Sequence, residues 1–173
     1  LFSKKNEKIL FIGNLKYLPN ILAVKSFVKN VLPKLQKKIP HIKLQIIGDI
    51  NLIDKILLKM NKNVDCLGVQ KNLDKFIKGA FCGLANLEIA TGVQGKILTY
   101  MSYGLPVICS KKVASSFNQN VLYYKNYHEF IDKILILNKD MKVSNKISKK
   151  SLSFVNNFKW KKISQDYLKV VRS

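Results

Sequence analysis

Short apolar runs alternate with stretches of helical periodicity along most of the chain. The runs with the length and residue types of buried strands are Ile9–Gly13, Lys43–Gly48, Val64–Val69, Phe81–Asn86, Pro106–Ser110 and Val121–Tyr124. Apolar residues three and four positions apart predict helices at Pro19–Lys38, Leu52–Met60, Leu73–Ala80 and Gly95–Tyr103. Pro33 predicts a kink or break near Leu32, because proline disrupts a helix interior. After Tyr127 the pattern is mostly helical to the end, with a break near Asn138–Ser144.

Strands that alternate with helices favour an α/β fold. We expect a Rossmann-like parallel sheet of about six strands, with helices on both faces and a helical C-terminal extension. In such sheets ligands bind in the loops that follow the carboxyl ends of the strands. These loops are predicted at residues 13–19, 48–51, 69–73, 88–95 and 110–120.

The composition indicates a folded, strongly basic chain. With 173 residues, of which 47% are hydrophobic, it has enough apolar side chains for a core and suits one domain or one lobe of a larger protein. No apolar run reaches the roughly 18 residues of a transmembrane helix. The net charge is +21, but every basic residue except Arg172 is lysine. Because nucleic-acid readers favour arginine, we expect solvated lysines rather than a nucleic-acid site, with some attraction to anionic lipid or other polyanions.

The familiar catalytic constellations are absent from the sequence. Cys66, Cys82 and Cys109 lie in apolar stretches, which predicts buried free thiols and a reducing cytosol. His41 and His128 are expected at the surface. There is no nucleophile elbow, Walker lysine, zinc-peptidase motif or dinucleotide fingerprint. Ten acidic residues also make a two-carboxylate glycosidase site hard to assemble.

The most informative segment is Thr91–Ser110, TGVQGKILTYMSYGLPVICS. Gly92 and Gly95 let backbone N–H groups approach a ligand at a helix N-terminus, and Lys96 adds a positive charge in the first turn. This combination suits a phosphate. An ordinary turn between strands, with one solvated lysine, explains the spacing equally well.

The same segment resembles the donor-binding signature of GT-B glycosyltransferases of the large family 4 group, the "glycosyl transferases group 1" type. The residues that match the signature in register are Gly92, Val93, Gln94, Lys96, Leu98, Met101, Gly104, Pro106, Val107 and Ile108. The opening 9–48, with its Pro-Asn after the glycine, the segment LGVQKNLDKFI and the closing Phe158-Lys159-Trp160 also resemble this family. The likeness therefore covers nearly the whole chain, in order.

The resemblance implies that this chain is the C-terminal, donor-binding lobe of a retaining glycosyltransferase. Residues 1–150 would bind a nucleoside diphosphate sugar, and a helix at 151–173 would cross towards an N-terminal lobe that carries the acceptor site and the catalytic base. Leu1 at the start of the chain fits the expectation of a fragment. The implied donor-binding residues are Gly13, Asn14, Lys16, Val69, Gly92, Val93, Gln94, Lys96 and Thr99.

The same resemblance implies a biological setting. Transfer would need neither a metal nor another cofactor, and the acceptor would be a glycan or lipid-linked sugar in bacterial polysaccharide or lipopolysaccharide-type synthesis. We expect a cytoplasmic protein, with peripheral contact at the inner face of an anionic membrane. The lysine-rich run Lys142–Lys150 is expected to be a solvated face, although a membrane-surface role would also suit it.

Two residues depart from the family pattern. The glutamate that usually grips the ribose hydroxyls is Thr99 here, and the earlier glutamate of the signature is Thr91. A hydroxyl binds ribose without charge assistance, and such neutral bonds are about half as strong. The missing glutamates leave open a degenerate relative that acts as a binding or assembly module. The net charge of +21 leaves open a basic polyanion-binding α/β domain. Trp160, Phe158, Tyr100, Met101 and Tyr103 are expected to be structural.

Overall fold

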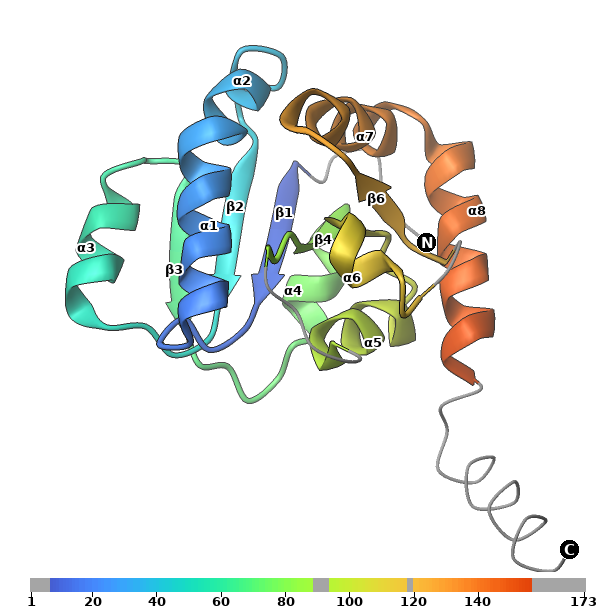
Figure 1. The fold of residues 1–173 in the computed structure, drawn as a ribbon, viewed down its shortest axis with the longest axis horizontal. Coiled ribbons are helices and arrows are strands. Elements are labelled where there is room, and N and C mark those ends of the chain that lie inside the picture. The colour runs from blue at the N-terminus through green and yellow to red at the C-terminus, as the bar shows by residue number, and fades with distance from the viewer. Residues whose placement is uncertain (1–6, 89–93, 118–119, 157–173) are drawn as a thin grey trace, which may run out of the picture.

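A computed structural model describes residues 7–88, 94–117 and 120–156. One sheet contains six parallel strands in the order β3-β2-β1-β4-β5-β6 (Figure 1). The strands are β1 (Lys8–Ile12), β2 (Lys43–Ile47), β3 (Val64–Gly68), β4 (Cys82–Ala85), β5 (Val107–Ser110) and β6 (Leu122–Tyr124). The predicted α/β class and parallel sheet are confirmed, and each predicted strand is present.

The helices follow the predicted alternation. They are α1 (Leu18–Asn30), α2 (Leu32–Gln36), α3 (Leu52–Lys59), α4 (Asp74–Lys78), α5 (Gly95–Ser102), α6 (Lys111–Ala114), α7 (Tyr127–Lys139) and α8 (Met141–Val155). The break predicted by Pro33 falls at Val31, and the later one falls at Asp140, whose carboxylate caps α8. The short helix α6 lies where we expected only a loop, because four residues are too few to produce a helical period.

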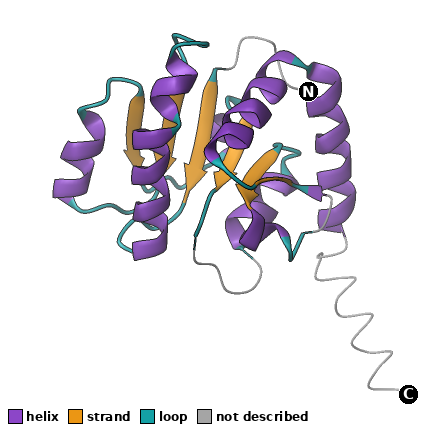
Figure 2. Ribbon diagram, turned by 45° about the horizontal axis from the view of Figure 1, so that its top comes forward, coloured by secondary structure: helices purple, strands orange, loops and turns teal. Residues whose placement is uncertain are grey.

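Helices cover both faces of the sheet (Figures 1 and 2). On one face α1 and α7 meet through Phe27 and Phe130, whose ring centroids are 5.5 Å apart. On the other face Tyr100 of α5 is fully buried, and its hydroxyl accepts a 2.7 Å hydrogen bond from the Ile12 amide. Tyr100 and Met101 are core residues, as expected. The three cysteines are buried and free, which confirms their prediction as structural thiols.

The strand ends that position the site are tied together by backbone hydrogen bonds. The Gly13 amide donates to the Ile47 carbonyl at 2.9 Å, and the Gly48 amide donates to the Gly68 carbonyl at 3.0 Å. Gly48 has φ +146°, and a Cβ atom there would lie 1.8 Å from the Gly13 carbonyl oxygen. The loops after β1 and β2 therefore approach each other too closely for a side chain to fit between them.

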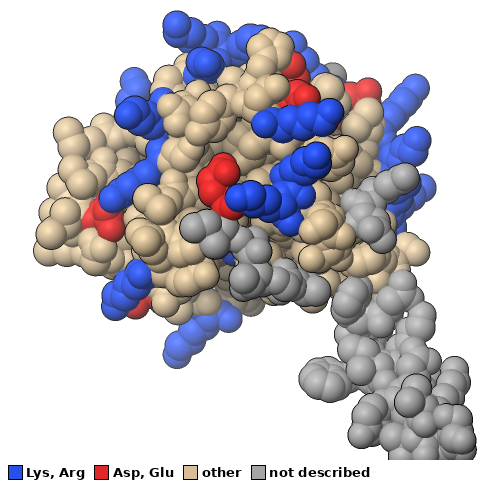
Figure 3. All heavy atoms as spheres, viewed as in Figure 1, with Lys and Arg blue, Asp and Glu red and all other residues tan. Residues whose placement is uncertain are grey.

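Charged side chains are spread over much of the surface. Figure 3 shows lysines along most of the visible face, with a largely uncharged area at the α3 end of the molecule. Lys142, Lys146, Lys149 and Lys150 of α8 are exposed, so this run is a solvated face as expected. None of the described helices has the length and apolar character needed to cross a membrane.

Candidate functional site

A partly buried lysine lies at the centre of the edge where the strands end. Lys96 belongs to the first turn of α5, and its Nζ donates a 2.6 Å hydrogen bond to Oδ1 of Asn20 in α1. The same Nζ lies 4.2 Å from the centroid of the Phe11 ring. Because Asn20 also donates to the Asn14 carbonyl at 2.8 Å, one amide joins the β1–α1 loop to this lysine.

The partners of the Lys96 ammonium are an amide oxygen and an aromatic ring, and neither carries a charge that would neutralise it. Among the described residues no carboxylate forms an ion pair with it. Burial lowers the pKa of Lys96 from 10.5 to about 8, so the side chain is still mostly protonated at neutral pH. A Cβ atom on Gly13 would lie 3.0 Å from this Nζ, so a side chain there would push the ammonium aside by a few tenths of an ångström. A partly buried cation with only neutral partners among the described residues is suited to bind an anion.

The two other predicted residues of the first loop have different surroundings. Asn14 accepts a 2.9 Å hydrogen bond from the Lys16 amide through Oδ1, which stabilises the loop. The Lys16 ammonium forms a 2.7 Å ion pair with Asp49 and is well exposed. This ion pair lowers the pKa of Asp49. An incoming phosphate would have to compete with Asp49 for Lys16, whereas Lys96 offers its charge without such a competitor.

The remaining predicted residues in the described part of the chain are Gln94 and Thr99, at and on α5, and Val69, which follows β3. Gln94 precedes α5 as its N-cap, and Thr99 donates a 3.1 Å hydrogen bond to the Gly95 carbonyl. With its proton used within the helix, the Thr99 hydroxyl is left as an acceptor, which is the role a glutamate would have. Gly92 and Val93 lie outside the described residues, as does Thr91.

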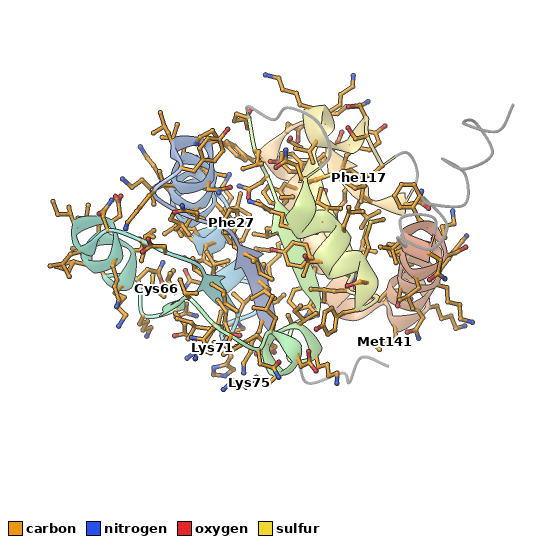
Figure 4. The ribbon with its side chains drawn as sticks, turned by 90° about the horizontal axis from the view of Figure 1, so that it is seen from below. Phe27, Cys66, Lys71, Lys75, Phe117 and Met141 are labelled. Carbon is orange, nitrogen blue, oxygen red and sulfur yellow. The ribbon has the colours of Figure 1, made fainter. Side chains whose placement is uncertain are left out.

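A shallow pocket of about 460 Å³ opens beside the end of β3. It is lined by Val69, Gln70, Lys71, Asn72, Asp74 and Lys75. Figure 4, seen from the edge where β1 to β3 end, shows Lys71 and Lys75 at α4, on the side of the sheet opposite Phe27. Val69 is 74% exposed, so its side chain leaves room for a ligand against this loop.

Comparison with known proteins places the chain in a family. A model of the family described as glycosyl transferases group 1 matches residues 6–140. The chain belongs to this family. A search of curated protein sequences found no match.

Solved structures with the same fold are GT-B glycosyltransferases. TarM of S. aureus superposes with a TM-score of 0.79 at 19% identity, over 100% of this chain and 36% of TarM. Anabaena HepE in complex with UDP and glucose gives 0.74 at 13% identity, over 97% of this chain and 48% of HepE. The pneumococcal O-GlcNAc transferase GtfA in complex with UDP and GlcNAc gives 0.73 at 17% identity, over 99% and 36%. This group 1 chain therefore spans less than half the length of these proteins.

The sequence did not indicate two of the residues that hold Lys96. In the sequence, Asn20 stands out only as part of a family-like Pro-Asn pair, and Phe11 only as part of a strand. Asn20 and Lys96 are 76 residues apart, so nothing local in the chain signals their contact. A polar residue on the buried face of α1 was the one available hint, since such groups need a partner.

A second cleft, of about 560 Å³, opens at the ends of β5 and β6. It is lined by Glu88, Ser110, Lys111, Lys112, Ser115, Tyr124 and Lys125. None of these residues was among the predicted site residues. The cleft follows from α6 and from the burial of Tyr124, neither of which the sequence pattern specified.

Replacing Lys96 with methionine should stabilise the fold at neutral pH. Since the folded state lowers the pKa of Lys96 from 10.5 to about 8, folding costs free energy below pH 8, and this cost is relieved between pH 8 and 10.5. We expect Lys96→Met to raise the free energy of unfolding by about 1 kcal/mol at pH 7, measured by urea denaturation. The gain should shrink towards pH 10. The exposed Lys16→Met serves as the control and should show no such pH-dependent gain; a less stable Lys96→Met at pH 7 would contradict the argument.

Proposed function

We propose that this chain is the donor-binding half of a glycosyltransferase that takes a hexose from a nucleoside diphosphate sugar. The observation that carries the proposal is the Lys96 ammonium, which is partly buried, has no described carboxylate partner and lies at the strand ends where α/β sheets bind ligands. Membership of the glycosyl transferases group 1 family supports it. So do the structures of HepE and GtfA, which contain UDP.

Each residue at the carboxyl ends of the strands has a role in this proposal. Lys96 and the N-terminus of α5 stabilise the negative charge that grows on the departing diphosphate, and preorganised charge of this kind lowers a barrier without a metal. The Gly13–Asn14 turn lies beneath the phosphates, and Lys16 can exchange Asp49 for a phosphate. The pocket at Val69 receives the nucleobase. Gln94 contacts the sugar and Thr99 accepts a hydrogen bond from the ribose, and Gly92 and Val93, which lie outside the described residues, remain predicted sugar contacts.

The acceptor side of the proposal depends on a second lobe. The transfer would be retaining, to a glycan or lipid-linked acceptor of bacterial polysaccharide synthesis, with the catalytic base on an N-terminal lobe and residues 151–173 crossing towards it. A cytoplasmic location suits these substrates. A second candidate, a binding module that has lost its activity, is favoured by Thr99, because a neutral hydroxyl replaces the carboxylate at the ribose.

Calorimetric titration of the 173-residue chain with UDP, GDP, ADP, dTDP and CMP tests the proposal. We expect selective binding of one nucleoside diphosphate at near-physiological salt, with UDP the first to try. If every polyanion binds alike, and the affinity collapses steeply with added salt, the chain is instead a basic polyanion-binding domain. If none binds to the folded chain, the donor-binding proposal fails for this chain.

Thr99→Glu should strengthen nucleotide binding. A carboxylate at this position of α5 would accept charge-assisted hydrogen bonds from the ribose hydroxyls, which are roughly twice as strong as neutral ones. We expect about a threefold to tenfold gain in affinity for the preferred diphosphate, measured by calorimetry. Ser102→Glu, which puts the same charge on an exposed position of the same helix, should give no gain. Equal effects of the two variants would rule out a ribose contact at Thr99.

The 173-residue chain should bind its donor but transfer no sugar. Its length corresponds to 36–48% of the structures it resembles, and the proposal puts the acceptor and the base elsewhere. Release of free diphosphate from the preferred nucleotide sugar, with and without candidate acceptors, measures this. Turnover by the chain alone would refute the half-enzyme proposal while leaving donor binding intact.

A further inference from the structure

The outer side of α3 is apolar and uncovered. Leu52, Ile53, Ile56, Leu57 and Met60 expose 70%, 72%, 57%, 53% and 79% of their surface. Only Leu58 of this helix is buried. Isolated exposed leucines are common on soluble domains, but five large apolar side chains exposed on and just after one short helix are not.

The neighbouring helix α1 also exposes large apolar side chains. Leu18 and Leu22 are exposed by 63% and 50%, and they share one stripe of α1 with Lys25, which forms a 2.5 Å ion pair with Asp54 of α3. This ion pair links the two helices. Together Leu18, Leu22, Leu52, Ile53, Ile56, Leu57 and Met60 form what we term the α1–α3 apolar surface. Figure 3 shows the corresponding end of the molecule, around α3, as mostly uncharged.

Lysines border this surface. Lys55, Lys59 and Lys62 lie on or just after α3, and Lys29 lies one turn beyond Lys25 on α1. The only acidic residue of α3, Asp54, is already paired with Lys25. The border is therefore strongly positive, in a chain whose net charge is +21. Lysine is depleted from protein–protein interfaces, whereas apolar residues flanked by lysines are typical of helices that lie on anionic bilayers.

We propose that the α1–α3 apolar surface docks the protein onto an anionic membrane. The α3 helix lies in the plane of the interface, its leucine, isoleucine and methionine side chains enter the boundary between headgroups and acyl chains, and the bordering lysines bind lipid phosphates. The lysine-rich α8 is a poorer candidate, because it has only one exposed large apolar side chain, Leu152, with 36% of its surface exposed. The proposal does not depend on donor binding.

Vesicle co-sedimentation separates this docking from general attraction by charge. With phosphatidylcholine vesicles containing about 30% phosphatidylglycerol, at about 0.15 M salt, the unmodified chain should bind. Ile56→Asn should weaken binding about fivefold and Ile53→Asn/Ile56→Asn more than tenfold, because the inserted apolar area is lost. Ile136→Asn, at an exposed isoleucine of α7, is the matched control and should bind as the unmodified chain does. Equal binding by all variants would overturn the proposal.

A fluorescent label tests insertion directly. Since Cys66, Cys82 and Cys109 are buried, an environment-sensitive dye can be attached selectively to Leu57→Cys or to Ile136→Cys. On vesicles the dye at position 57 should shift to the blue and brighten, and the dye at 136 should change little. Identical responses would refute insertion by α3. A concentration-dependent dimer in analytical ultracentrifugation that Ile56→Asn abolishes would also overturn the proposal, because a second copy would then cover this surface.

Discussion

Lys96→Ala should weaken binding of the preferred nucleoside diphosphate at least thirtyfold. At pH 7 the lysine is mostly protonated, because burial lowers its pKa only to about 8. Removing a buried charged partner of a phosphate costs about 2 kcal/mol or more, since the anion loses a charge-assisted hydrogen bond in a poorly solvated place. Calorimetric titration of both chains measures the loss. Circular dichroism and urea unfolding show whether the variant keeps its fold.

Two controls make this result specific. Lys16→Ala removes the same charge from a neighbouring position, but its ammonium is exposed and already paired with Asp49, so the affinity should fall less than about threefold. The affinity of the unmodified chain should also decline as the pH rises above about 8, when Lys96 loses its proton, and Lys96→Ala should lack this decline. Unchanged affinity in Lys96→Ala would end the phosphate role of this residue.

The fold was predictable because its signal is local. The strands β1, β2, β4 and β5 are short runs that are buried on both faces over most of their length, as in β1, where Ile9, Leu10 and Phe11 are almost fully covered. Proline fixed the helix break at Val31 through its missing N–H. The helix α6 was missed, since four residues carry no period.

The site was predictable only in part, because its contacts join distant segments. The glycine and lysine pattern before α5 pointed to Lys96 as a phosphate ligand, but nothing in it indicated Asn20 or Phe11 as its neighbours. The Lys16–Asp49 ion pair likewise follows from the pairing of β1 with β2, which places the two following loops together. The spacing of apolar residues predicts the position of α3, but it does not predict that Leu58 is the only buried residue of this helix.

Gly48→Ala should destabilise the protein by about 3 kcal/mol or more. Its φ of +146° is strained for any residue with a side chain, and the new Cβ would lie 1.8 Å from the Gly13 carbonyl oxygen, so one of the two loops must move. Thermal and urea unfolding measure the loss. Because Gly13 lies against the Lys96 ammonium, nucleotide affinity should fall as well, even in the fraction that stays folded.

Alanine substitutions at two other glycines distinguish the cost of a positive φ from the cost of a steric clash at Gly48. Gly68 has φ +69°, but the methyl group of an alanine there would meet nothing within 4 Å, so Gly68→Ala should cost about 1 kcal/mol from backbone strain alone. Gly95 has no positive φ and, within the described part of the chain, no atom within 4 Å of an added Cβ, so Gly95→Ala should change stability by less than about 0.5 kcal/mol. If Gly48→Ala is no worse than Gly68→Ala, the loops after β1 and β2 are not in close contact. The close packing of these two loops would then not help to position Gly13 beside the Lys96 ammonium.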